Sequence, residues 1–195
     1  TPAEVKELVP YIDESIILGG YYQPTVGVVD SLRTGTIMRE KAQEMGAAQS
    51  FANVEVQDIK VENGVVKAVV TDQGTIEADY VVIATGCWSP KLAAMAEAHI
   101  PLTPAVHQMK DIGPVPFFKD TKGDIEWPIV RDMDVFMYER QHGTGLEIGS
   151  YAHRPILYTP DDIPSNATAA LSPTEFAFTQ ADFDIQDEHA YELMP

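Results

Sequence analysis

The spacing of apolar residues changes from a helical period to a strand period near Phe51. In the stretch from Leu32 to Met45, apolar residues recur at the three- and four-residue spacing of one helix face. Asp30 and Ser31 precede this stretch as N-cap signals, and Gly46 follows it as a C′ residue. The pattern therefore predicts a helix, whose apolar face holds Leu32, Ile37, Met38 and Met45.

Alternating apolar and polar residues then predict three short strands in succession. Residues 54–61 alternate with period two, and residues 65–70 return with the same pattern. Between them, Glu62-Asn63-Gly64 is typical of a type I′ hairpin turn, because Asn-Gly adopts positive φ at little cost. Asp72-Gln73-Gly74 forms a second turn before residues 75–78. The sequence therefore predicts an antiparallel meander.

A different pattern follows in the stretch VVIATGCWS. Residues 80–83 are apolar on both faces, which predicts a strand buried between two layers. Ala84-Thr85-Gly86 would end this strand with small residues, and Ser89 with Pro90 is typical of a helix N-terminus. Such an end lets a ligand approach the backbone, and a helix N-terminus favours an anion. The same small residues are equally typical of simple close packing.

The second half of the chain is mainly strand-like, and helices are expected at both ends. Thr1-Pro2-Ala3-Glu4 and Ser172-Pro173-Thr174-Glu175 have the form of capping boxes, Pro10 ends the first helix, and residues 179–182 can cap a last one. Residues 141–145 form a loop. The expected strands cover residues 105–112, 129–130, 135–140 and 146–151.

Composition excludes several classes of protein. The chain has 195 residues with 13 basic and 30 acidic side chains, a net charge of −17, so nucleic acid is not an expected partner. Cys87 is the single cysteine, which excludes an intrachain disulfide and a cysteine-rich zinc site, and we expect no metal. No apolar run approaches the roughly 18 residues of a membrane span, and no signal peptide is visible. The cytoplasm is the expected compartment.

Several segments resemble a known family of flavoproteins. A meander that leads into Ala-Thr-Gly resembles the glutathione-reductase-type FAD fold. Residues 79–89, DYVVIATGCWS, are similar to the ADxVVxAxGxWS segment of the D-amino-acid-oxidase superfamily, and residues 20–46 resemble its GGxxxPxxGxVDP region. Residues 104–108, 134–140 and 148–155 resemble segments of dimethylglycine oxidase and of the dimethylglycine and sarcosine dehydrogenases.

The resemblance implies an α/β fold class with mixed α+β elements. Residues 1–99 would form part of an FAD-binding domain, and residues 100–195 an antiparallel-sheet substrate domain with a helical tail. The GxGxxG loop of the family is absent from the chain, so we expect an internal fragment of the flavin domain. FAD is the implied cofactor, with a covalent histidyl link through an upstream residue. Tetrahydrofolate would bind a downstream domain, and a eukaryotic protein would lie in the mitochondrial matrix.

The implied reaction is oxidative demethylation of dimethylglycine or sarcosine, by hydride transfer from the N-methyl carbon to flavin. Oxygen or an electron-transfer flavoprotein would then reoxidise the flavin. By resemblance, His107 and Tyr138 are the catalytic pair; the residues implied in cofactor binding are Val56, Ala84, Thr85, Gly86 and Trp88. From the residues alone, His107 and Tyr138 are typical of ordinary sheet packing, and Trp88 of a core.

Other readings remain open at the level of sequence. Arg140 is either a carboxylate ligand or a surface charge, and residues 153–154 either line a site or end a strand. The substrate is alternatively another amino acid such as glycine, whereas glycerol phosphate is disfavoured because no basic cluster is present to bind the phosphate. A flavin-free interaction module is the alternative from another class of protein.

Overall fold

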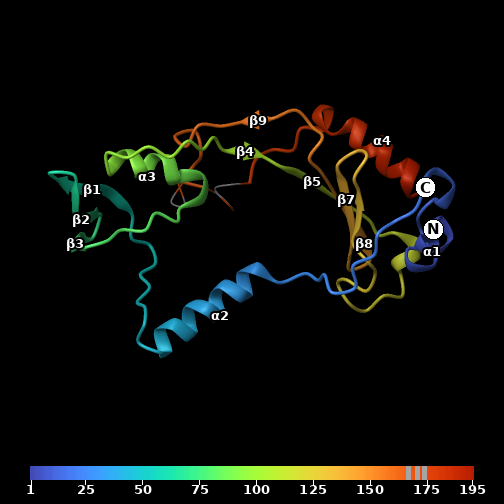
Figure 1. Cartoon of the computed structure of the whole chain (residues 1–195), viewed down its shortest axis with the longest axis horizontal. Helices are drawn as coiled ribbons and strands as arrows, with labels where there is room; N and C mark the ends of the chain where they lie inside the picture. The colour runs from blue at the N-terminus through green and yellow to red at the C-terminus, as the bar shows by residue number, and fades with distance from the viewer. Residues whose placement is uncertain (166–167, 170–171, 173–174) are drawn as a thin grey trace. The chain divides into compact units, whose positions relative to one another are not determined.

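The computed structural model describes residues 1–165, 168–169, 172 and 175–195, and it divides into two compact units (Figure 1). One unit comprises residues 23–102. The other joins residues 1–22 to residues 103–195. The first residues of the chain therefore pack with its second half, and the two units are described separately below.

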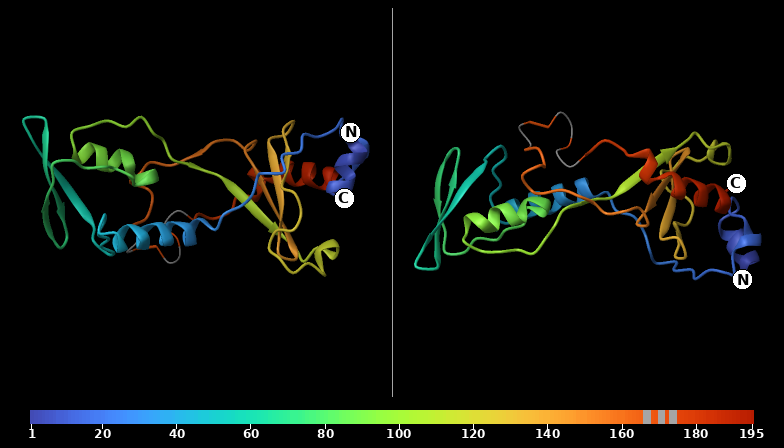
Figure 2. Two further views of the ribbon diagram at one scale, coloured as in Figure 1. Left: turned by 60° about the horizontal axis from the view of Figure 1, so that its bottom comes forward. Right: turned by 90° about the horizontal axis from the view of Figure 1, so that it is seen from above.

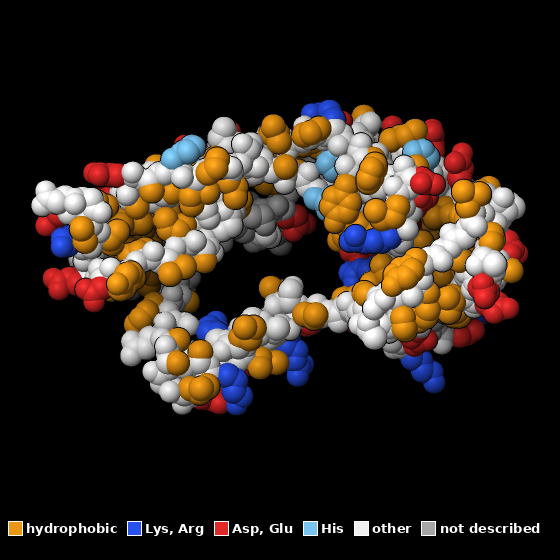
Figure 3. Space-filling view, viewed as in Figure 1, with side chains coloured by type: hydrophobic (Ala, Val, Ile, Leu, Met, Phe, Trp, Pro, Cys, Tyr) orange, Lys and Arg blue, Asp and Glu red, His pale blue; other side chains and the backbone are white. Residues whose placement is uncertain are grey.

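The unit of residues 23–102 begins with helix α2 (Ser31–Glu44). Its N-cap is Asp30, whose Oδ1 accepts a hydrogen bond from the Arg33 amide at 2.9 Å, and Gly46 follows the helix with a φ of 68°. These end signals confirm the predicted helix. Its apolar face is not buried within the described residues, and Leu32 is 85% exposed; orange side chains are visible on this helix in Figure 3.

The predicted meander is present as three antiparallel strands in sequential order, β1 (Val56–Glu62), β2 (Val65–Thr71) and β3 (Gly74–Glu77). Asn63 and Gly64 have φ values of 53° and 75°, which confirms the positive φ expected of their turn. Helix α3 (Ser89–Met95) contacts β1. The buried apolar residues of this unit are Ile59, Ala68 and Ala93.

The predicted buried strand at residues 80–83 is wrong. This segment has no regular secondary structure, and Tyr80 and Val82 are 91% and 87% exposed. A strand requires neighbours that complete its hydrogen bonds and layers that cover its faces, and no described strand pairs with this segment. The following helix also begins differently, because a 3-10 turn, η2 (Gly86–Trp88), precedes α3. Ser89 is therefore its first residue and not its N-cap.

The N-terminal segment belongs to the second unit and starts with helix α1 (Pro2–Leu8). Both halves of the predicted capping box form: the Glu4 amide donates to Thr1 Oγ1 at 3.4 Å, and the Thr1 amino group donates to Glu4 Oε2 at 2.8 Å. A 3-10 turn, η1 (Glu14–Ile16), follows. Val9 and Ile12 are buried against Leu193, which anchors the segment to the end of the chain.

A four-stranded antiparallel sheet forms the centre of this unit, in the order β5-β8-β7-β6. The predicted strand at residues 105–112 is divided at His107 into β4 and β5, and β4 pairs with β9 instead of joining the sheet. His107 therefore lies at a break between two strands. The strands are β4 (Ala105–Val106), β5 (Gln108–Ile112), β6 (Val130–Asp132), β7 (Met137–His142), β8 (Gly145–Ser150) and β9 (Ile156–Leu157).

One face of the sheet is covered by helix α4 (Asp184–Leu193), which runs beside the strands in both views of Figure 2. Short 3-10 turns, η3 (Pro116–Phe118) and η4 (Gln180–Asp182), complete this layer. The predicted last helix is confirmed, but Thr179 does not cap it; its hydroxyl donates to Gln108 Oε1 at 2.9 Å. The core consists of Phe118, Met137, Leu146, Ile148, Phe183 and Ala190.

The predicted capping box at residues 172–175 includes positions outside the described residues. No described helix combines the length and the apolar character that a bilayer crossing requires.

Candidate active site

The face of the sheet opposite α4 carries the side chains that could take part in catalysis. Side chains alternate along β7, so Tyr138 and Arg140 point to the face opposite the buried Met137 and Glu139. The strand register places Tyr138 opposite Gly149 and Arg140 opposite Glu147. Cross-strand pairing therefore gathers aromatic and charged groups on one surface.

The structure brings His107 and Tyr138 together, although they are 31 positions apart in sequence. His107 Nε2 lies 2.8 Å from the Tyr138 hydroxyl oxygen, which is hydrogen-bond distance. The break between β4 and β5 positions the histidine, and β7 positions the tyrosine. The Tyr138 hydroxyl also donates to Met109 Sδ at 3.4 Å, so its hydrogen has two acceptors within reach.

Gly149 makes room for the Tyr138 ring. A Cβ on residue 149 would lie 2.0 Å from Tyr138 Cζ and 2.1 Å from its hydroxyl oxygen, distances that real atoms do not reach. The ring therefore lies directly over the β8 backbone, and this places its hydroxyl beside His107. The sequence contains this glycine in GSYAHRP, but no local signal marks it as the support of a ring on another strand.

Two more rings surround His107. The Tyr151 ring is stacked on the imidazole at a centroid distance of 4.5 Å and an interplanar angle of 19°, and the His153 ring lies at 6.1 Å. His153 Nδ1 is 2.8 Å from the Arg154 carbonyl oxygen, which can only accept, so Nδ1 carries a hydrogen. Sequence reasoning missed Tyr151, because only the bend after β8 turns this ring toward His107.

The surroundings keep both members of the pair uncharged at neutral pH. Burial lowers the pKa of His107, and the neighbouring His153 adds a smaller effect of the same sign. Burial raises the pKa of Tyr138, with further increases from Tyr151 and Glu147. A neutral imidazole is a base, and a protonated phenol is a hydrogen-bond donor.

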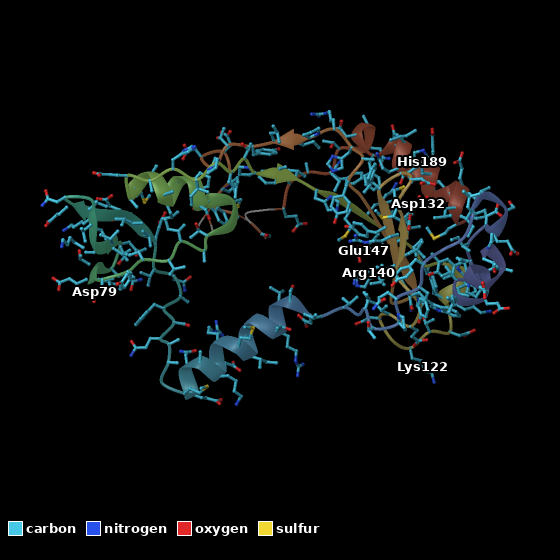
Figure 4. All side chains as sticks on the ribbon, in the orientation of Figure 1. Asp79, Lys122, Asp132, Arg140, Glu147 and His189 are labelled. Carbon is cyan, nitrogen blue, oxygen red and sulfur yellow. The ribbon has the colours of Figure 1, made fainter. Side chains whose placement is uncertain are left out.

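Two arginines near the site are paired with carboxylates. Arg140 Nε donates to Glu147 Oε2, and Figure 4 shows the two side chains on neighbouring strands. Glu147 is almost fully buried, so Arg140 neutralises a buried charge and is not the surface charge that the sequence left open. Arg154 donates to both oxygens of Asp182, at 2.6 and 2.9 Å.

One group of possible metal ligands was not anticipated. Asp111, His142 and Glu147 each place one ligand-type atom within 4.8 Å of the others. The Glu147 carboxylate is already bound by Arg140, whose positive charge opposes a cation at this position. The expectation that the chain has no metal site stays a prediction.

The residues implied in cofactor binding lie in the unit of residues 23–102. Val56 is the first residue of β1, Ala84 and Thr85 are exposed, and Trp88 is half-buried before α3. Gly86 has a φ of 56°, and a Cβ there would have no neighbour within 4 Å.

The segment that ends at Ala84 fits a nucleotide cofactor on one structural ground. In the described part of the chain, the backbone of residues 80–84 makes no hydrogen bond to another backbone group. The small residues that follow leave that backbone accessible, so its donors and acceptors can pair with a ligand. Their role in binding stays a prediction.

Comparisons with known proteins identify the family of the chain. Residues 1–195 match the family described as FAD dependent oxidoreductase, designated DAO. Mitochondrial sarcosine dehydrogenase of Mus musculus is 33% identical over 163 residues, which cover 81% of this chain and 17% of the relative. Formaldehyde-forming 4-methylaminobutanoate oxidase of Paenarthrobacter nicotinovorans is 30% identical over 177 residues, which cover 89% of this chain and 20% of the relative. Mitochondrial dimethylglycine dehydrogenase of Mus musculus is 29% identical over 150 residues, covering 77% and 17%.

Among solved structures, L-proline dehydrogenase from P. horikoshii superposes on the whole chain with a TM-score of 0.77, at 28% identity and over 47% of its own length. The chain spans about a fifth of the length of the three relatives named above. The family match extends over every residue, and the fold agrees with it. The chain therefore belongs to the DAO family of FAD-dependent oxidoreductases.

Proposed function

We propose that the protein oxidises an N-methyl amino acid, dimethylglycine or sarcosine, in an FAD-dependent reaction at His107 and Tyr138. The observation that carries this proposal is the contact of 2.8 Å between His107 Nε2 and the Tyr138 hydroxyl, on an open sheet face. The names of the three relatives add support, since sarcosine, 4-methylaminobutanoate and dimethylglycine are all N-methyl amino acids.

The substrate amine defines the first task of the site. An alkylamine is protonated at neutral pH, and its nitrogen lone pair must be free before a hydride leaves the methyl carbon. His107 is suited to take this proton, because its lowered pKa keeps it in the basic form near pH 7. When bound, FAD supplies the acceptor for the hydride.

Tyr138 complements the base in two ways. Its raised pKa keeps the phenol protonated, so the hydroxyl can donate to a substrate carboxylate or hold the imidazole. Met109 Sδ gives the hydroxyl hydrogen a second acceptor. With its hydrogen on Met109 Sδ, the hydroxyl oxygen accepts a hydrogen bond from His107 Nε2 in both the neutral and the protonated imidazole, so Nδ1 is the nitrogen that takes the substrate proton and the contact survives the transfer.

The unit of residues 23–102 would hold the nucleotide part of FAD. We assign this role to five residues of this unit: Ala84, Thr85, Gly86, Val56 and Trp88. Replacing Gly86 by valine would add a side chain at positive φ, where branched residues are strained. We expect this variant to be isolated with less bound FAD, measured by the ratio of flavin to protein absorbance, whereas Gly27→Val is the control because Gly27 lies outside the positive-φ region.

Four further features belong to the same proposal. A covalent histidyl flavin would remain attached after acid precipitation, whereas a non-covalent one would be released. Tetrahydrofolate in a neighbouring domain would accept the one-carbon unit. The amount of free formaldehyde released would therefore decrease when tetrahydrofolate is added. Oxygen or an electron-transfer flavoprotein would reoxidise the flavin, and stopped-flow mixing with each distinguishes them. The expected compartment is the cytoplasm, or the mitochondrial matrix in a eukaryote.

Anaerobic mixing of the flavin-loaded protein with substrate tests the proposal directly. We expect dimethylglycine or sarcosine to bleach the flavin absorbance at millimolar concentration. His107→Gln should slow this reduction by about 100-fold or more, the range of general-base catalysis. A flavin spectrum that neither substrate changes would contradict the proposal.

L-proline and glycine belong in the same experiment as alternative substrates. L-proline is a secondary amine, and the structural likeness to L-proline dehydrogenase is a specific reason to include it. If L-proline reduced the flavin and neither N-methyl substrate did, the proposed substrate would be wrong. The proposed role of His107 as the base would still stand.

A further inference from the structure

The ring of Tyr151 has a defined position beside the proposed catalytic pair. It lies 4.5 Å from the His107 ring at 19°, and 5.8 Å from the Tyr138 ring at 49°. Its backbone is held at the same time, because the Tyr151 amide donates to the Phe136 carbonyl at 3.0 Å. The backbone of Tyr151 is therefore hydrogen-bonded to the turn that precedes β7, and this bond limits where its ring can lie.

A hydrogen bond by itself does not orient an imidazole. The contact between His107 Nε2 and the Tyr138 hydroxyl fixes one atom of the ring, and the ring can still rotate about that contact. A stacked neighbour fixes the plane of the ring. The two contacts together determine where the second nitrogen, Nδ1, points.

We propose that Tyr151 is a positioning residue that holds the His107 imidazole in its plane and stabilises its protonated form. The inference rests on the proposed function, since it assigns Tyr151 to the same reaction. The aromatic ring and not the hydroxyl carries the effect, because stacking places the two ring faces against each other. An imidazolium over the face of a tyrosine ring also gains a cation–π interaction.

The other titratable and charged groups around His107 and Tyr138 shift the pKa values of this pair in known directions. His153 follows β8 and opposes a positive charge on His107. The pKa of Tyr138 on β7 is influenced by Tyr151 itself and by three charged residues of the sheet, Glu147 on β8, Arg140 on β7 and Arg131 on β6. Changing residue 151 leaves these groups in place, but it removes the contribution of Tyr151 to the pKa of Tyr138. A leucine at this position retains apolar bulk beside the imidazole and removes both the aromatic ring and its hydroxyl, whereas a phenylalanine removes the hydroxyl alone.

Two variants separate the ring from the hydroxyl. Tyr151→Phe retains the stack, and Tyr151→Leu removes it. Tyr151 is 61% exposed, so neither change should unfold the protein, which circular dichroism can verify. We would record the imidazole proton resonances of the flavin-loaded protein by NMR between pH 5 and 8, with His107 identified by its loss in His107→Gln.

We expect a stacked ring to shift the His107 proton resonances upfield in the unaltered protein and in Tyr151→Phe, and this shift should vanish in Tyr151→Leu. The pKa of His107 should fall by about half a unit in the leucine variant, the size of an exposed cation–π contact. Unchanged resonances and pKa in Tyr151→Leu would overturn the inference. So would a phenylalanine variant that behaves like the leucine variant.

The kinetic measurement gives an independent result. With dimethylglycine or sarcosine, the acidic limb of the pH profile for flavin reduction should move to lower pH in Tyr151→Leu and stay in place in Tyr151→Phe. The maximal rate should fall in the leucine variant because Nδ1 is less well oriented. If the unaltered protein is not reduced at all, the proposed function fails, whereas the NMR titration still decides the role of Tyr151.

Discussion

Tyr138 and Gly149 occupy opposed positions of β7 and β8, and the tyrosine ring fills the space that a Cβ on residue 149 would take. This relationship holds the hydroxyl next to His107, so a residue without a side chain supports the proposed catalytic pair.

Gly149→Ala should therefore disturb the site without touching a catalytic group. The new Cβ would force the Tyr138 ring away, because the two cannot share the space. We expect a loss of about 1–3 kcal/mol in the free energy of unfolding, the usual range for overpacking, and slower flavin reduction. Urea unfolding and stopped-flow reduction measure the two effects.

Gly35→Ala provides the matched control. Gly35 lies in helix α2, and a Cβ there would have no neighbour within 4 Å. Alanine is the better helix former by about 1 kcal/mol, so this variant should not be destabilised. Equal behaviour of the two variants would mean that Tyr138 does not lie over Gly149.

Replacing His153 should change the pKa of His107. The pKa of His107 is lowered first by burial and then by the nearby His153. His153→Gln removes the second effect and keeps an acceptor for the Gln108 amide, so the pKa of His107 should rise. Flavin reduction requires the neutral imidazole, and its acidic limb should consequently move to higher pH.

The pH dependence of flavin reduction tests this with His99→Gln as the control. His99 is exposed and lies in the other unit, in residues 23–102. Its replacement should leave the profile unchanged. A His153→Gln profile identical to that of the unaltered protein would show that the two imidazoles are not coupled.

Glu139 should make the stability of the fold depend on pH. Its side chain is 1% exposed, and neither carboxyl oxygen has a hydrogen-bond partner among the described residues. Burial, with a smaller effect from Asp132, raises its pKa from 4.5 to about 8. Between these values the folded state binds more protons than the unfolded state. The free energy of unfolding should therefore fall as the pH rises from about 4.5 to about 8, by an amount on the order of a few kcal/mol.

Glu139→Gln removes this titration. Compared with the unaltered protein, the variant should gain relative stability as the pH is raised from 5 to 8 in urea unfolding experiments. Parallel pH curves for the two proteins would mean that Glu139 keeps an ordinary pKa in the folded state.

The pair Arg140 and Glu147 should behave as a buried ion pair. Arg140→Gln leaves the Glu147 carboxylate, whose side chain is 3% exposed, without its cation. We expect a loss of roughly 3 kcal/mol, whereas adding Glu147→Gln should recover much of it because the buried charge is removed. Thermal or urea unfolding of the single and double variants measures the coupling.

An exposed pair is the control for this cycle. Lys41 and Glu44 are 66% and 63% exposed, so Lys41→Gln should change stability by less than about 1 kcal/mol. If Arg140→Gln were equally mild, Glu147 would be solvated and not buried.

The sequence by itself determined the elements whose signals are local. Asp30 and Gly46 bounded α2 because caps act within one helical turn, and Asn63-Gly64 marked a hairpin because the turn requires positive φ. His107 and Tyr138 were named by resemblance to a family, and their contact belongs to the structure.

Tertiary structure decided everything that depends on distant neighbours. Residues 80–83 have the composition of a buried strand, but burial requires paired strands and covering layers, which the described chain does not place there. Gly149 under Tyr138 and Tyr151 over His107 follow from strand register and from one bend after β8. The pairing between strands determines which side chains come into contact. The residues adjacent in sequence do not determine that pairing, so it could not be predicted from local sequence.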